Sequence, residues 1–233
     1  MEANRLSKIL ACAGVASRRA AEHLIFDGKV RVNEEIVTVP QTIVDPKTDK
    51  VYVDDERVEF KDEKVYYILN KPKGYICSNK RMGTKKLVID LFAELKHRLF
   101  TIGRLDRDTT GLILLTNDGH FAQKVIHPSN NLSKEYLVKT QQEITHEHLV
   151  ELSKGTLIEG KWVRPVKVTK VRRGTIKVTV KEGKKREVRL MVQNAGLTLL
   201  TLSRIRIGGL RLGPLQEGEW RELTEQECKL IFA

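Results

Sequence analysis

The chain has 233 residues, and its 42 Lys and Arg outweigh its 30 Asp and Glu to give a net charge of +12. This excess favours a polyanionic partner, with nucleic acid the first candidate. The apolar runs Leu112–Leu115 and Leu197–Leu202 are far shorter than the roughly 18 residues of a membrane span, and no apolar segment follows the first charges as in a secretory signal. Cys12, Cys77 and Cys228 are widely spaced, which excludes a disulfide framework and a CxxC zinc site. We therefore expect a cytoplasmic nucleic-acid-associated protein.

The positive charge is concentrated in the later part of the chain. Residues 1–62 hold 10 basic and 12 acidic residues, whereas residues 63–233 hold 32 basic and 18 acidic ones. The densest run, Lys161–Arg189, has twelve basic residues against Glu182 and Glu187. A pair of solvated strands is the ordinary interpretation of such a run. Cations held this close together repel one another, however, and a phosphate backbone would relieve that repulsion.

The first 60 residues predict a small module of two helices and a few strands. Residues 5–12 have apolar residues at helical spacing, with Gly14 just beyond as a stop. Ser17 is a suitable N-cap for a second helix, Arg18–Phe26, which Asp27 and Gly28 end in a turn. Short strands are expected at Val30–Val32, Ile36–Val37, Lys50–Val53 and Arg57–Glu59. We expect residues 1–60 to form one domain and residues 61–63, in the segment FKDE, to be a linker.

Residues 64–233 predict a larger second domain in which strands outnumber helices. The expected strands are Val65–Asn70, Leu99–Leu105, Leu112–Thr116, Tyr136–Thr140, Val163–Val171, Thr175–Lys181 and Leu199–Ile207. The expected helices are Leu87–Leu95, Gly119–His127, Thr145–Ser153 and Lys185–Asn194. Strand–helix–strand units rarely recur, so the fold class is α+β with a mixed, mostly antiparallel sheet.

The sequence contains no motif for a metal or a nucleotide cofactor. P-loop, GxGxxG, HExxH and Cys/His ligand spacings are all missing. The notable segment is GRLDRDTTGLILLTNDG, over Gly103–Gly119, where a polar turn separates two apolar strands. Such a turn presents a carboxylate at a strand end, where it can face a cleft. The ordinary alternative is an Asx-type turn residue, and spacing does not choose between Asp106 and Asp108.

That segment resembles the catalytic-loop motif of the pseudouridine synthases, in the RsuA-like family that modifies ribosomal RNA at single sites. Four further segments resemble motifs of the family in the same order: KPKGYICS (Lys71–Ser78), KEY (Lys134–Tyr136), EGKKREVRLM (Glu182–Met191) and the closing Arg204–Leu223. The N-terminal segment that begins at Arg5 resembles the alpha-L RNA-binding module. Glu187 and Leu190 depart from the family pattern, in which Gln and Arg are common.

The resemblance implies an enzyme that turns a uridine of RNA into pseudouridine without a cofactor or a metal. It implies that Asp106, and not Asp108, is the catalytic carboxylate. It also implies that Arg189 is the cationic partner that favours the charged form of this carboxylate. Tyr136 matches the active-site tyrosine, whose ring can stack on uracil and whose hydroxyl can take part in proton transfer. Without the motifs, a tyrosine in an apolar strand and an arginine in a basic helix would be assigned to the core and to a phosphate contact.

Further basic residues are expected to hold the RNA while the target uridine is extruded from its fold. Arg104 lies two residues before the aspartate and could brace the vacated stack. The expected basic hairpin Lys161–Lys181 could follow the phosphate backbone. Arg186, three residues before Arg189 on the expected helix, would share its face and contact a phosphate. The other expected RNA contacts are Lys134 and, in the N-terminal module, Arg5, Lys8, Ser17, Arg18, Arg19, Lys29 and Arg31.

Two other function classes compete with the enzyme. A non-enzymatic RNA-binding or ribosome-assembly factor could keep the fold, but such a protein would be expected to lose one of Asp106, Tyr136 and Arg189. A DNA- or membrane-binding basic face would explain the charge but not the motifs. The segment KKREVR resembles the large-subunit, RluB-like branch of the family, so the expected substrate is 23S rRNA in preference to 16S rRNA. A monomer is the expected state.

Overall fold

The computed structural model describes residues 2–60 and 63–233. It divides into two units: the first extends to Lys64 and the second begins at Val65, except that segments 96–98 and 117–119 group with the first. The expected linker, 61–63, includes Lys61 and Asp62, which lie outside the described residues, so the domain limits of 1–60 and 64–233 stay predictions. None of the helices in these described ranges is long and apolar enough to cross a membrane.

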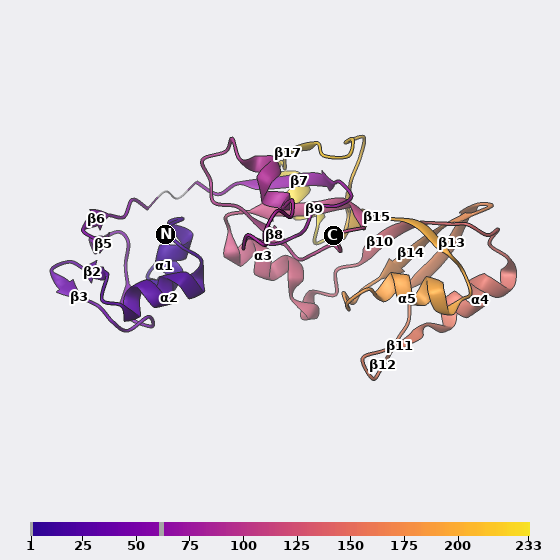
Figure 1. Ribbon diagram of the computed structural model, residues 1–233, viewed down its shortest axis with the longest axis horizontal. Coiled ribbons are helices and arrows are strands. Elements are labelled where there is room, and N and C mark those ends of the chain that lie inside the picture. Colours follow the sequence, from indigo (N-terminus) through magenta and orange to yellow (C-terminus); the bar gives the residue numbers. More distant parts are fainter. Residues whose placement is uncertain (1, 61–62) are drawn as a thin grey trace. The chain divides into compact units, whose positions relative to one another are not determined.

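The first unit has two helices, α1 (Leu6–Cys12) and α2 (Arg18–Phe26), close to the expected bounds (Figure 1). The Ser17 hydroxyl accepts a hydrogen bond from the Ala20 amide at 3.2 Å and so caps α2 as predicted. Its strands form one sheet in the order β3-β2-β5-β6 and a separate β1–β4 pair. They are β1 (Asn4–Arg5), β2 (Val30–Val32), β3 (Glu35–Ile36), β4 (Ile43–Val44), β5 (Val51–Val53) and β6 (Glu56–Arg57). The core contains Leu6, Leu10, Ala21, Ile25, Val30, Val44 and Val51.

The second unit is organised around a nine-stranded sheet in the order β13-β14-β10-β15-β9-β7-β17, with β16 on β15 and β8 on β9. Among the described strands of this sheet, every pair is antiparallel except β15–β9. The expected α+β class with a mixed, mostly antiparallel sheet is therefore confirmed. The strands are β7 (Tyr66–Lys71), β8 (Phe100–Ile102), β9 (Thr110–Thr116), β10 (Lys134–Thr140), β13 (Lys167–Arg172), β14 (Thr175–Val180), β15 (Leu199–Ile207), β16 (Leu210–Arg211) and β17 (Trp220–Glu222).

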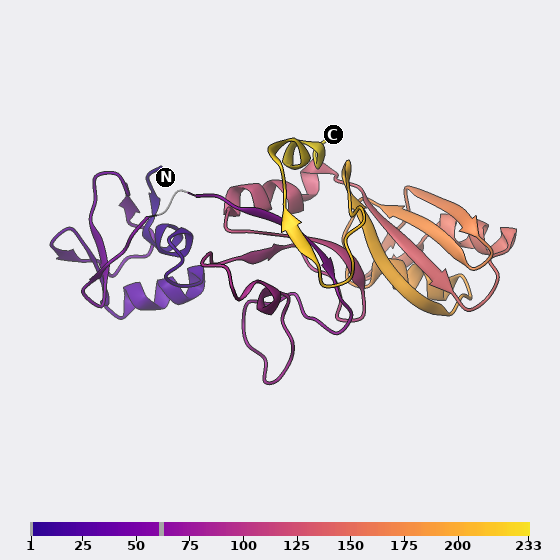
Figure 2. The same ribbon diagram turned by 90° about the horizontal axis from the view of Figure 1, so that it is seen from above.

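Both faces of the sheet are buried at β7 and β9, because alternate side chains of these strands pack into cores on opposite faces. Ile68, Leu112 and Leu114 pack on one face with α3 (Gly119–Ile126) and the end of α6 (Glu225–Leu230), which lie side by side in Figure 2. Leu69 and Ile113 face the other way, toward the short 3-10 helix η1 (Val88–Phe92). The longer helix expected over Leu87–Leu95 was wrong, since only these five residues are helical. A second 3-10 turn, η2 (Pro128–Asn130), follows α3.

The other half of the sheet, β10, β14 and part of β15, packs against α4 (His146–Lys154) and α5 (Glu187–Asn194). Thr145, the first residue of the helix expected there, is the N-cap of α4. The basic hairpin expected over Lys161–Lys181 is confirmed for β13 and β14, which pair on either side of Arg173 and Gly174, but it does not extend back to Lys161. The structure has two hairpins, because β12 (Lys161–Val163) pairs with β11 (Thr156–Ile158), whereas β13 pairs with β14.

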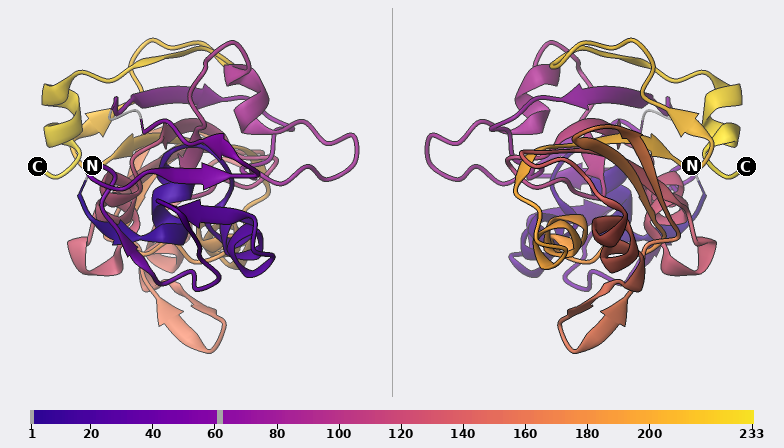
Figure 3. Two further views of the ribbon diagram at one scale, coloured as in Figure 1. Left: turned by 90° about the vertical axis from the view of Figure 1, so that its left-hand side faces the viewer. Right: turned by 90° about the vertical axis from the view of Figure 1, so that its right-hand side faces the viewer.

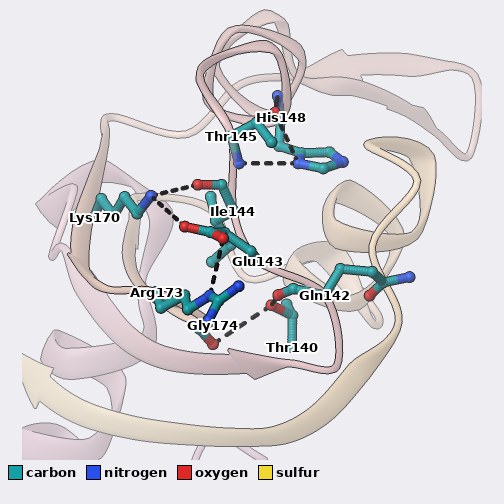
Figure 4. A network of polar contacts seen from close by, with 9 residues as sticks. All are labelled: Thr140, Gln142, Glu143, Ile144, Thr145, His148, Lys170, Arg173 and Gly174. Carbon is teal, nitrogen blue, oxygen red and sulfur yellow. Dashed lines mark hydrogen bonds and ion pairs between the residues drawn. The ribbon is translucent and has the colours of Figure 1, made fainter.

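Acidic residues outside the basic run neutralise part of its charge. Glu143 accepts from Arg173 Nε at 2.9 Å and lies 3.9 Å from Lys170 Nζ, which also donates to the Ile144 carbonyl (Figure 4). Thr140 Oγ1 bonds the Gln142 and Gly174 carbonyls in the same network. The repulsion inferred from the linear run is therefore partly relieved inside the protein. We refer to Glu143, Lys170 and Arg173 as the Glu143 cluster.

Candidate active site

The loop that carries Asp106 joins β8 to β9, and a buried lysine donates hydrogen bonds to its backbone. Lys71, at the end of β7, has no solvent exposure. Its ammonium donates to the carbonyls of Thr109 at 2.9 Å, Pro72 at 3.0 Å and Arg107 at 3.3 Å. Burial lowers the pKa of Lys71, and nearby carboxylates and the Cys77 thiol oppose this shift. The lysine therefore fixes the loop backbone and does not face the substrate side.

A glycine allows the same loop to enter the sheet. Gly111 has a φ of +100°, and a Cβ at this position would lie 2.2 Å from the Arg204 carbonyl oxygen. Only glycine fits both the close approach and the left-handed backbone. The parallel pairing of Gly111 with Arg204 thereby sets where the Asp106 loop leaves the sheet.

Arg189, in the first turn of α5, lies against Asp106. Its Nε is 3.6 Å from the Asp106 Oδ2, and its Nη2 donates to Thr109 Oγ1 at 2.9 Å. The Asp106 side chain keeps 39% of its exposure, whereas that of Arg189 keeps 17%. Asp108 is exposed and is not part of the cleft wall. The structure thus separates the two aspartates that sequence spacing left equivalent.

Asp106 opens into a cleft of about 890 Å³, a size that suits a nucleotide. Tyr136 lies on the wall from β10, directly across the strand pair from Arg204 on β15. Arg104 and Thr109 from the Asp106 loop also line the cleft. Arg189 does not line the cleft, but it contacts Asp106 through the ion pair described above. The three residues expected to be catalytic therefore lie in or against one cleft.

One wall of the cleft contains buried charges. Glu187 is 4% exposed, and its Oε2 accepts from the Lys184 amide at 3.1 Å. Burial raises the pKa of Glu187, and Glu182 adds to this, whereas the Lys184 amide and the charges of Lys134 and Lys184 oppose it. Burial lowers the pKa of Lys134, and Arg204 adds to this while Glu187 opposes it. Among the described side chains, Glu187 Oε1, Arg189 Nε and Arg204 Nη2 are buried without a hydrogen-bond partner.

The RNA-binding residues expected in the second unit lie around this cleft, but the predicted position of Arg186 on the helix of Arg189 was wrong. Arg104 and Arg186 are exposed in its lining, and Lys134 donates to the carbonyls of Leu132 and Lys181. Arg186 is not three residues earlier on the same helix face as Arg189. It is the N-cap of α5 with a left-handed φ of 58°, because the helix begins at Glu187 and not at Lys185.

In the first unit, the expected RNA contacts Ser17 and Arg31 have intramolecular bonds. Ser17 caps α2, and the Arg31 guanidinium lies 4.1 Å from the Tyr52 ring centroid while it donates to the Asn33 carbonyl at 2.9 Å. Five others lie around the two helices and the following turn, with Lys8 partly exposed and the rest exposed: Arg5, Lys8, Arg18, Arg19 and Lys29.

Sequence reasoning assigned no role to four residues that shape the site: Lys71, Thr109, Glu187 and Arg204. Arg204 could have been predicted to be buried, because it lies two residues after Leu202 in the strand Leu199–Ile207 and so points to the same face of the sheet. Lys71 ends an apolar strand that is buried from Tyr67 onward. A charged residue at a buried strand position indicates a specific internal partner or a site.

Two protein-family models match the chain. The model for RNA pseudouridylate synthase matches residues 65–194, which include Asp106, Tyr136 and Arg189. The chain belongs to the RNA pseudouridylate synthase family. An S4 domain model matches residues 4–50, which identifies the first unit as the RNA-binding module expected from the sequence.

Relatives of the pseudouridine synthase family match over nearly the whole chain. The ribosomal large subunit pseudouridine synthase B of Bacillus subtilis is 40% identical over 98% of this chain and 96% of its own length. The chloroplast protein SVR1 of Arabidopsis thaliana, whose name also refers to ribosomal large subunit pseudouridine synthases, is 47% identical over 97% of this chain. This chain spans 60% of the length of SVR1. A pseudouridylate synthase crystal structure, 30% identical, superposes with a TM-score of 0.69 over 98% of this chain and 99% of its own.

Proposed function

We propose that this protein converts a uridine of large-subunit ribosomal RNA, 23S rRNA in bacterial terms, into pseudouridine. The observation that carries the proposal is the Asp106 carboxylate, which opens into the nucleotide-sized cleft with Arg189 at 3.6 Å behind it and Tyr136 on the wall. The names of the Bacillus and Arabidopsis relatives support the large subunit as the source of the RNA.

The reaction breaks the bond from N1 of uracil to C1′ of ribose, rotates the base and joins C5 to C1′. The proton lost from C5 is balanced by the proton gained at N1, so that nothing is oxidised and no group leaves. Asp106 could attack the ribose, attack the ring or remove a sugar proton, and each of these uses requires an ionised oxygen. Arg189 would hold that oxygen in place and stabilise its charge. Because the atoms balance within one nucleotide, the proposed reaction needs no cofactor.

Tyr136 would hold the extruded base in the cleft. Its ring would offer a stacking face for uracil, and its hydroxyl would take part in proton transfer. Arg104 and Arg186, exposed in the cleft lining, would contact the phosphates beside the target nucleotide. The exposed cations of the S4 unit would add sequence-independent affinity for the folded RNA. We extend the proposal to a cytoplasmic protein that acts as a monomer.

The test is to incubate the purified protein with unmodified large- and small-subunit rRNA transcripts and to map pseudouridine by chemical labelling. One new pseudouridine in the large-subunit transcript, formed without any added cofactor, is expected. Modification of the small-subunit transcript alone would overturn the substrate and keep the reaction. Binding of both transcripts without isomerisation would favour the non-enzymatic RNA-binding factor.

A further inference from the structure

A surface away from the cleft combines an exposed tryptophan with unpaired cations. Leu157 and Trp162 face each other across the β11–β12 hairpin, and they are 60% and 58% exposed. Figures 1 and 3 show this hairpin set apart from the large sheet, below α5. A groove lined by His146, Val150 and Arg164 adjoins it. We name Val150, Lys154, Leu157, Lys161, Trp162 and Arg164 the α4–hairpin surface.

The hairpin is held rigidly on the two helices of this half of the unit. The Trp162 indole Nε1 donates to the Lys154 carbonyl at 2.9 Å, which fixes the ring at the end of α4. At Gly155, a Cβ would lie 2.1 Å from the Val163 carbonyl oxygen, so the chain approaches β12 closely there. Asn194, the last residue of α5, donates to Thr156 Oγ1. An exposed ring that is already oriented loses little conformational entropy when a ligand stacks on it.

Two cations of this surface, Lys161 and Arg164, have no carboxylate partner among the described residues. Among the described residues, no carboxylate lies within ion-pair distance of Lys161, Arg164 or Lys167. Two cations further along the same run differ, because Lys170 and Arg173 are paired with Glu143. On the α4–hairpin surface, Lys154 is paired with Glu151, and Glu159 is the acidic residue of the hairpin turn. Free cations beside an exposed aromatic ring are the combination that binds single-stranded nucleic acid.

Helix α5 connects this surface to the cleft. Its N-terminal residues, Glu187 and Val188, line the cleft, and Asn194 at its other end bonds the hairpin. Eight helical residues span about 12 Å. An unpaired RNA segment that leaves the cleft along α5 would therefore reach Trp162 within a few nucleotides of the target uridine.

We propose that the α4–hairpin surface is a second RNA contact, where Trp162 stacks on an unpaired base flanking the target and Arg164 and Lys161 bind the adjoining phosphates. This inference rests on the proposed function for the identity of the RNA. The occupant is RNA and not an apolar protein segment, because the free cations Lys161 and Arg164 outnumber the single acidic residue of the turn, Glu159, and the ring is fixed with its surface exposed.

The test compares the affinity of four full-length proteins for an unmodified large-subunit rRNA transcript at one fixed salt concentration. Trp162→Ala is expected to raise Kd about tenfold, within the range for loss of one base–aromatic stack. Trp162→Phe keeps a stacking face and is expected to stay within about threefold of the unchanged protein. Leu200→Ala, a control that alters a side chain of similar exposure (59%) on β15, is expected to leave Kd unchanged.

Binding is measured apart from pseudouridine formation, so a failure of the proposed function would not be mistaken for a failure of this surface. RNA binding should also quench the tryptophan fluorescence of the unchanged protein, and Trp162→Phe should abolish that quenching. An unchanged Kd for Trp162→Ala would overturn the proposal. Equal losses for Trp162→Ala and Leu200→Ala would overturn it as well. Loss of a bound protein partner with normal RNA affinity would assign the surface to a protein instead.

Discussion

Two clusters of cations and carboxylates in the second unit differ in how completely their atoms are bonded. In the Glu143 cluster, Glu143 Oε2 accepts from Arg173 Nε at 2.9 Å, and Lys170, 3.9 Å from Glu143 Oε1, donates to the Ile144 carbonyl (Figure 4). In the Asp106 cleft, Arg189 stands 3.6 Å from the aspartate, beyond hydrogen-bond distance. Buried polar atoms of Arg189, Glu187 and Arg204 have no partner in the described structure.

The difference separates a structural cluster from a functional one. Exposed ion pairs such as those of Glu143 contribute up to about 1 kcal/mol and hold a turn in place. A buried polar atom without a partner costs about 1 to 3 kcal/mol, and this cost is tolerated where a ligand will use the group. Buried charged groups without hydrogen-bond partners thus identify the functional cleft more clearly than a dense run of basic residues in the sequence does.

The largest effect is expected from the carboxylate at the centre of the cleft. Asp106→Asn should lower pseudouridine formation at least about a thousandfold, because the amide is nearly isosteric but cannot act as an anionic nucleophile or base. RNA affinity and the unfolding midpoint should change little. Asp108→Asn, at the exposed position of the same loop, is the matched control, and equal losses for the two variants would show that the carboxylate is wrongly assigned.

Arg189→Lys tests whether the cation behind Asp106 must hold two groups at once. A lysine keeps the charge but cannot bond Thr109 and face Asp106 with the same planar fork. We expect kcat to fall about 10- to 100-fold with KM nearly unchanged, as measured in single-turnover and steady-state assays. Lys170→Arg in the Glu143 cluster is the control and should leave kcat unchanged. A rise in KM alone would show that Arg189 binds RNA instead.

Glu187→Gln should stabilise the fold, because it removes a buried charge without a full set of partners. The folded-state pKa of Glu187 is raised, so its ionised form destabilises the protein as the pH rises above the ordinary value of 4.5. The variant is expected to gain about 1 kcal/mol at pH 7, and the gain should disappear below about pH 4, where glutamate is protonated in both states. Urea unfolding at the two pH values measures this. A loss of stability at pH 7 would show that Lys134 depends on this charge.

Glu143→Gln should have the opposite sign and the smallest size. Removing one partner of an exposed pair is expected to cost about 0.5 kcal/mol at pH 7, with pseudouridine formation unchanged. The cost should shrink in 1 M salt, where exposed pairs are screened. A loss of activity in this variant would contradict the division between a structural and a functional cluster.

The sequence by itself determined the elements whose signals are local. The Ser17 cap and apolar spacing predicted α2 at Arg18–Phe26, and alternation predicted β15 at Leu199–Ile207, because capping and periodicity act over a few residues. The resemblance of the ordered motifs to one enzyme family also predicted Asp106, Tyr136 and Arg189 as residues of one active site. Their resemblance to known motifs selected Asp106 over Asp108, a choice that spacing alone had left open.

Only the tertiary structure decided which charges are buried, paired or free. Lys71 and Arg204 lie in the interior because strands distant in the chain pair there, and Glu143 pairs with Lys170 and Arg173 from outside their own run. Arg186 has a left-handed backbone and precedes α5, so it does not share the helix face of Arg189. This backbone conformation belongs to the loop before the helix. Burial and ion pairing are sums over neighbours in space, whereas capping and alternation are properties of neighbours in sequence.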